Sequence, residues 1–132
     1  MTSASPCPCG SEKPYKTCCG TFHSGKETAP TAEVLMRSRY SAFAKQEITY
    51  LKETTWPPYQ KHFDEAGYLA RAQTSIWLGL EISDTQDGST EDTKGSVTFT
   101  AKFMAEGQME EQREKSLFKK KNGRWYYVKP IG

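Results

Sequence analysis

The feature that most constrains this chain is a cluster of four cysteines near the N-terminus, at positions 7, 9, 18 and 19. Residues 20–132 contain no cysteine at all. Cysteines crowded in this way can form disulfides, remain as free thiols or share one metal ion. A disulfide or a shared metal ion would fix the local chain path, so in either case the N-terminal segment is expected to have a structure of its own.

Two observations favour a metal over disulfides. The opening segment MTSASPCPCG lacks the basic and apolar regions of a signal peptide, so we expect a cytoplasmic protein with reduced thiols. Adjacent cysteines are also poor disulfide partners, because the bridge strains the peptide between them. Tetrahedral zinc takes four sulfur or nitrogen ligands, which favours zinc while leaving disulfides and free thiols as alternatives. The expected zinc ligands are Cys7, Cys9, Cys18 and Cys19.

The residues between the cysteine pairs suit a compact metal-binding turn. Ser11 follows a glycine in a predicted turn, and its hydroxyl can donate a hydrogen bond to a thiolate. Pro14 and Gly20 suit the start and the end of a short helix over residues 15–19. His23 lies four residues after the last cysteine and is a candidate replacement ligand, although an exposed loop histidine is the simpler interpretation.

The segment CPCGSEKPYKTCCG, residues 7–20, resembles the SEC-C zinc motif, known from the C-terminus of the SecA translocation motor. Glu12 departs from the motif, which usually has a second glycine there. The stretch TAEVLMRSRYSAFAKQEITYLKETTW, followed by IWLGLEI and GRWYYV, resembles the YchJ family of small bacterial proteins. This resemblance implies a SEC-C zinc-binding segment over residues 1–25 and a nuclear-transport-factor-2-like domain, in the cystatin-like class, over residues 26–132.

Hydrophobic periodicity predicts helices in the first half of the remaining chain. Thr31 is a plausible N-cap for a helix that runs to about Gln46, and residues 47–54 and 64–73 are expected to be helical as well. Residues 21–30 are polar and are predicted to be a short linker. The prolines after Trp56 are expected to end helical structure.

The second half has the period of β-strands. Strands are predicted over residues 76–82, 97–103, 111–121 and 124–129, with Asn122-Gly123 as a hairpin turn and residues 83–94 as a mobile loop. Helices followed by a run of antiparallel strands predict an α+β fold with a curved sheet packed on the helices. This agrees with the fold that the resemblance implies.

Chemistry-bearing residues in the second domain form weaker patterns. His62 and Asp64 are a histidine–carboxylate pair that could act in acid–base catalysis, but exposure to solvent is the simpler interpretation. Arg37 and Glu114 are a candidate buried ion pair, which more often serves fold specificity than chemistry. A cone-shaped pocket, common in such folds, would be lined by polar side chains. The candidates are Arg37, Tyr40, Tyr50, His62, Asp64, Glu114 and Tyr126.

Three functional hypotheses remain. We favour an adapter, in which the zinc segment binds a protein or a ribosome, by analogy with SecA, over a catalytic role. The alternative is a small enzyme or ligand carrier that uses the pocket. Nucleic-acid binding through residues 113–129, with seven basic residues and one acidic, is weaker because the net charge is only +2. No apolar run approaches the roughly 20 residues of a membrane span, so no membrane role is expected.

Overall fold

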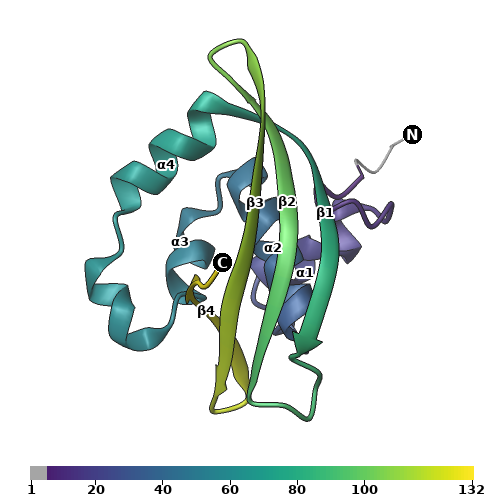
Figure 1. Ribbon diagram of the computed structural model, residues 1–132, viewed down its shortest axis with the longest axis vertical. Coiled ribbons are helices and arrows are strands. Elements are labelled where there is room, and N and C mark those ends of the chain that lie inside the picture. Colours follow the sequence, from purple (N-terminus) through teal and green to yellow (C-terminus); the bar gives the residue numbers. More distant parts are fainter. Residues whose placement is uncertain (1–5) are drawn as a thin grey trace.

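The computed structural model describes residues 6–132, in which four antiparallel strands form one sheet with helices packed against it (Figure 1). The strands follow the chain in the order β1-β2-β3-β4 and are β1 (Ser75–Asp87), β2 (Lys94–Ala105), β3 (Gln108–Lys121) and β4 (Arg124–Pro130). The α-helices are α1 (Cys19–His23), α2 (Ala32–Lys45), α3 (Ile48–Glu53) and α4 (Glu65–Thr74). Two 3-10 helices are η1 (Tyr15–Thr17) and η2 (Pro57–His62). The predicted α+β class is confirmed.

Helix α2 begins and ends where the sequence predicts. The Thr31 hydroxyl oxygen accepts a hydrogen bond from the Val34 amide at 3.1 Å, which satisfies one of the unpaired amides of the first turn. Gln46 ends the helix with a left-handed φ of 58°. The apolar side of α2 packs on the sheet, where Leu35 (1% exposed) meets Val97 and Phe118 (both 0%) in the core. This contact fixes the helix against the strands.

The predicted hairpin turn is confirmed, because Asn122 and Gly123 both have positive φ, 53° and 79°. The predicted loop over residues 83–94 is wrong in extent. Strand β1 continues to Asp87, which pairs with Gly95 of β2, so only residues 88–93 connect the two strands. The turn depends on two glycines, since a Cβ on Gly95 would lie 2.5 Å from the Gly88 Cα.

A β-bulge changes which face of β1 is buried. Strict alternation would place Ile76 and Leu78 on the same side as Leu80. The register shifts between Trp77 and Gly79, however, and Ile76 and Leu78 are 62% and 46% exposed. One extra residue reverses the alternation, so Trp77 and Leu80 both pack against the core. The pattern of alternating residues predicts the strand correctly but cannot locate the bulge.

Two connecting segments have more structure than the sequence predicts. The expected linker over residues 21–30 starts within α1, and Ala29 is buried in the core at 6% exposure. The prolines after Trp56 do not end helical structure, because Pro57 begins η2. Proline suits the first helical turn, where its missing amide N–H would have no intrahelical partner. Among the helices of the described residues, none has the length and apolar character that a bilayer span requires.

Candidate metal centre

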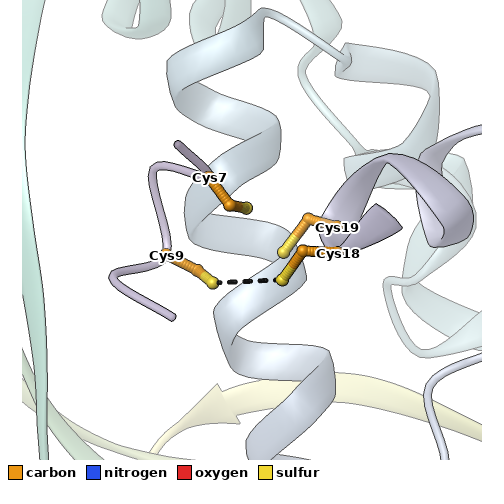
Figure 2. Close-up of side chains that lie close together, drawn as sticks. All are labelled: Cys7, Cys9, Cys18 and Cys19. Atoms are coloured by element: carbon orange, nitrogen blue, oxygen red, sulfur yellow. Dashed lines mark hydrogen bonds between the residues drawn. The ribbon is translucent and has the colours of Figure 1, made fainter. Parts of the chain in front are cut away.

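The four cysteine side chains converge on one point (Figure 2). All four sulfur atoms lie within 4.8 Å of one another, and the Cys9 and Cys18 sulfurs are 3.7 Å apart. Three of the side chains are buried, Cys18 is half-buried, and all four thiols are free. These sulfurs could therefore hold a single metal ion. We call residues 6–23, which contain the cluster and its supporting turns, the knuckle.

A tight backbone turn brings the first cysteine pair to the second. The Cys7 amide donates to the Lys13 carbonyl at 2.9 Å, and the Gly10 amide donates to the Cys7 carbonyl at 3.2 Å. Gly10 and Glu12 both have left-handed φ, 84° and 69°. Glu12 stands where the motif usually has glycine, and its positive φ explains that preference, because a residue with a Cβ is strained there.

Two serine hydroxyls lie within hydrogen-bond distance of the sulfur atoms. Ser11 Oγ lies 3.1 Å from Cys18 Sγ, as the sequence predicts, and itself accepts from the Lys13 amide. Ser41 Oγ, on α2, lies 3.4 Å from Cys7 Sγ. Such bonds stabilise thiolates and orient them. Sequence reasoning missed Ser41, because it lies far along the chain and only the fold brings it to the cluster.

Helix α2 also holds the knuckle through Arg37. Its Nη1 donates to the Cys9 carbonyl oxygen at 2.9 Å, and its Nε pairs with Glu33 at 3.0 Å. The predicted pair of Arg37 with Glu114 is therefore wrong. The two residues serve different sides of the molecule, and the helical period turns Arg37 toward the knuckle.

His23 is half-buried at the end of α1, so the expectation of an exposed loop histidine is wrong. Its Nε2 donates to the Ser38 carbonyl at 2.8 Å, and its Nδ1 accepts from the Tyr15 hydroxyl at 2.6 Å. Its ring also packs on Tyr50, with the centroids 4.7 Å apart. Burial lowers the pKa of His23 below its ordinary value of 6.5, so the ring is neutral at pH 7. Both ring nitrogens are occupied, which places His23 outside the sulfur cluster.

The thiols influence one another's ionisation strongly. Hydrogen bonds from Cys19 and then Cys9 lower the pKa of Cys7, so one thiolate is readily stabilised. The pKa of Cys19 is raised far above the ordinary range by the hydrogen bonds that Cys19 makes with Cys7 and Cys9, together with burial. Four thiolates packed this closely repel one another, so full ionisation requires a cation among them.

Comparison with known proteins places this architecture in a family. The model of the YchJ middle, NTF2-like domain matches residues 31–130, and the SEC-C motif matches residues 5–21. The chain belongs to the YchJ family. The chain is also similar to UPF0225 protein GSU1048 of Geobacter sulfurreducens and to UPF0225 protein SCO1677 of Streptomyces coelicolor. The first relative is 40% identical to this chain, and the match covers 96% of this chain and 78% of the relative. The second is 44% identical, and the match covers 93% of this chain and 92% of the relative.

Solved structures of SEC-C proteins share the YchJ-family fold seen here. The solution structure of RPA3114, a SEC-C motif containing protein from Rhodopseudomonas palustris, has a TM-score of 0.88 at 34% identity. The match covers 97% of this chain and 98% of the RPA3114 chain. The crystal structure of a SEC-C motif containing protein from Psychrobacter arcticus has a TM-score of 0.85 at 30% identity, over 98% of this chain and 83% of its own. Together with the match to the NTF2-like domain model, these structures confirm the NTF2-like class that the resemblance implied.

In this YchJ-family chain Asp64, one member of the predicted acid–base pair, caps a helix. His62 and Asp64 are both exposed, as the simpler interpretation expects. Asp64 caps α4 by accepting from the Gly67 amide at 3.0 Å. Glu114 accepts hydrogen bonds from Ser116 and Tyr127 on the inner side of the sheet. These groups lie on the opposite side of α2 from the knuckle.

Proposed function

We propose that this protein is a zinc-binding adapter whose knuckle presents a surface to a macromolecular partner. The observation that carries the zinc assignment is the convergence of four cysteine sulfurs, with a separation of 3.7 Å between Cys9 and Cys18. Zinc–sulfur distances of about 2.3 Å give tetrahedral sulfur–sulfur edges of about 3.8 Å, which fits this donor set. Soft thiolates also select zinc over harder cations such as magnesium.

The zinc is proposed to be structural. Four protein ligands complete a tetrahedron and leave no position for water or substrate. The knuckle has few apolar contacts of its own, so metal binding would supply most of its folding free energy. Ser11 and Ser41 would orient the ligands, and Arg37 and His23 would fix the folded knuckle on α2. In the reducing cytoplasm the four thiols would remain available to the metal.

The partner is proposed to bind the outer surface of the knuckle. The inner surface is occupied by α2, whereas Glu12, Lys13 and Lys16 on the outer surface are exposed. The Lys45 ammonium group lies 4.6 Å from the centre of the Tyr15 ring and adds a third positive charge beside them. The resemblance of the motif to that of SecA supports a protein or a ribosome as the partner.

Native mass spectrometry with elemental analysis tests the metal assignment. The protein is purified with no added metal, and we expect one zinc per chain. A metal-free chain lighter by the mass of two or four hydrogens would show disulfides and contradict the proposal. Treatment with a chelator is expected to remove the zinc and disorder the knuckle.

Cosedimentation with purified bacterial ribosomes tests the partner. The double variant Lys13→Glu/Lys16→Glu reverses the charge of the knuckle surface and is expected to lose binding that the native chain shows. Lys121→Glu/Lys129→Glu is the matched control, with the same charge change at exposed positions near β4. Loss of binding in the control alone would instead favour nucleic-acid binding through the basic strands. Absence of binding by the native chain would contradict the ribosome as partner.

A further inference from the structure

A second feature, independent of the knuckle, is a cavity of about 400 Å³ between α2, α4 and the inner face of the sheet. Pockets that bind small organic molecules have volumes of about 300–1,000 Å³. In Figure 1, α4 stands apart from the strands, on the side of the molecule opposite the knuckle. The knuckle ligands do not line the cavity, so it is a separate site.

Six of the 14 residues that line the cavity are aromatic. Phe43 of α2 stacks on Tyr68 of α4, with ring centroids 5.6 Å apart and planes at 16°. Trp77 of β1 packs against Phe43 at 5.3 Å and meets Tyr40 edge-on at 5.7 Å. Such walls favour a flat ligand with a ring, because aromatic faces and edges give stacking contacts beyond simple area burial.

Arg39 is a buried cation on the wall of this cavity. It is 4% exposed, and its guanidinium carbon lies 4.7 Å from the centre of the Tyr127 ring. Its Nη1 donates to the Leu51 carbonyl oxygen at 2.8 Å and to the Thr54 hydroxyl at 2.7 Å, and both acceptors are neutral. Within residues 6–132 the ion pairs are Arg37–Glu33 and Lys52–Glu65, so neither neutralises Arg39.

The carboxylates near the cavity are already supplied with donors. Glu114 accepts hydrogen bonds from Gln112, Ser116 and Tyr127. Asp64 at the rim accepts from the first turn of α4. The two lining arginines also meet neutral groups, since Arg71 lies 5.6 Å from the centre of the Phe43 ring and donates to the Gln112 side chain. Arg39 is the most buried of these charges, because Glu114 is half-buried and Asp64 and Arg71 are exposed. A buried charge is costly without a counter-charge, so Arg39 favours an anion beside it.

We propose that this cavity binds a small aromatic carboxylic acid, with its carboxylate toward the Arg39 guanidinium and its ring between the aromatic walls. The planar guanidinium suits a carboxylate, because two parallel N–H groups match its two oxygens. Arg71 at the rim adds positive charge on the path of entry. Stacking distinguishes this ligand class from inorganic anions, which gain nothing from the rings.

Isothermal titration calorimetry of the zinc-loaded protein with 2-naphthoate tests the proposal. We expect one saturable site, and binding of the neutral isostere 2-naphthamide that is weaker by about tenfold or more, because charge-assisted hydrogen bonds are about twice as strong as neutral ones. Inorganic phosphate at the same concentration is expected not to displace 2-naphthoate. Equal binding of the amide, displacement by phosphate, or no heat at millimolar 2-naphthoate would each overturn the proposal.

Two variants locate the binding site. Ala101→Leu fills the cavity from β2 and is expected to weaken 2-naphthoate binding by about tenfold or more, because the added side chain occupies the ring position. Thr100→Val, on the opposite face of the same strand, is the matched control and should bind as the native chain does. Unchanged binding by Ala101→Leu would place the ligand elsewhere and overturn the assignment.

Arg39→Gln tests the charge itself. Circular dichroism first establishes that the variant folds, since Arg39 also bonds to the end of α3. We expect it to reduce 2-naphthoate binding to the level of 2-naphthamide while leaving the amide unchanged, a pattern that a purely structural role would not produce. Equal losses for both compounds would contradict the role of Arg39. If Arg39→Gln does not fold, the proposal is tested by comparing the binding of 2-naphthoate and 2-naphthamide to the native chain and to Ala101→Leu. The knuckle assignment stands or fails separately, by its zinc content.

Discussion

Helix α2 carries the knuckle on one side and the sheet on the other, and the two contacts use different residue types. Toward the knuckle it presents polar groups, because the Arg37 and Ser41 side chains contact a carbonyl and a sulfur, and the Ser38 backbone carbonyl accepts from His23. Toward the sheet it presents Leu35 and Tyr40, which belong to the apolar core. The knuckle thus depends on a few directed bonds and its thiols, whereas the domain depends on buried area.

This difference indicates which substitutions should destabilise each part. Directed bonds and proposed metal ligands are few, so we expect the loss of one to affect the whole knuckle. Core packing is spread over many contacts, so a single truncation weakens the domain without removing its fold. We expect the two parts to be separate units of stability although α2 joins them. The following variants test this expectation, from the largest expected effect to the smallest.

Cys7→Ser should have the largest effect. We expect it to lose the zinc and disorder residues before about 25, because structural zinc sites contribute about 10–16 kcal/mol of apparent binding free energy. Elemental analysis reports the metal, and amide hydrogen exchange reports the knuckle and the sheet separately. The sheet should keep its protection, and global unfolding would contradict the independence of the two parts.

Phe118→Ala tests the opposite case, in which the core of the domain is weakened and the knuckle is left unchanged. Phe118 is 0% exposed in the core, and its truncation should lower the free energy of unfolding of the domain by about 3–5 kcal/mol. Urea denaturation measures this change, and zinc content should remain one per chain in the folded state. Lys121→Ala, at an exposed position of the same strand, is the matched control with little expected effect. Loss of zinc from folded Phe118→Ala would show that the core controls the knuckle.

His23 should make stability depend on pH. Burial lowers its pKa below 6.5, so the unfolded chain binds a proton in acid before the folded chain does. Its contribution is therefore complete above pH 6.5 and is lost as the pH falls toward the lowered pKa. Denaturation from about pH 7.5 to about pH 5 should show a shallower decline in His23→Gln than in the native chain. The native chain and His23→Gln contain the same thiols. An equal dependence of the free energy of unfolding on pH in the two proteins would therefore show that His23 does not cause the decline.

Glu12→Gly should have the smallest effect, in the stabilising direction. Glu12 has a φ of 69°, and glycine removes the steric strain of this conformation at some cost in chain entropy, for a net gain of about 0.5–1 kcal/mol. The variant should release zinc more slowly to a chelator, as followed with a zinc-sensitive dye. Glu12→Ala removes the same side chain without freeing the backbone, and a gain of equal size there would contradict the explanation.

Most element positions could be predicted from the sequence, because the signals are local. Thr31 caps α2, Asn122-Gly123 forms the last hairpin, and Ser11 contacts a sulfur, all within a few residues of the motif that indicates them. The bulge at Trp77 and Gly79 could not be predicted, since it reverses the period without changing the residue types. The pairing of Arg37 was mispredicted, because its orientation depends on the position of the knuckle.

The sequence alone predicted that four thiols would lie close together, because Gly10-Ser11 predicts a turn after the first cysteine pair and four local sulfurs can share one metal ion. It also determined the α+β order through periods that each segment carries by itself. Only the tertiary structure decided which side chains meet those thiols and which surround the cavity. Ser41 reaches Cys7 and Arg39 is buried beside Tyr127 because packing joins residues far apart in the chain, and such contacts leave no local pattern.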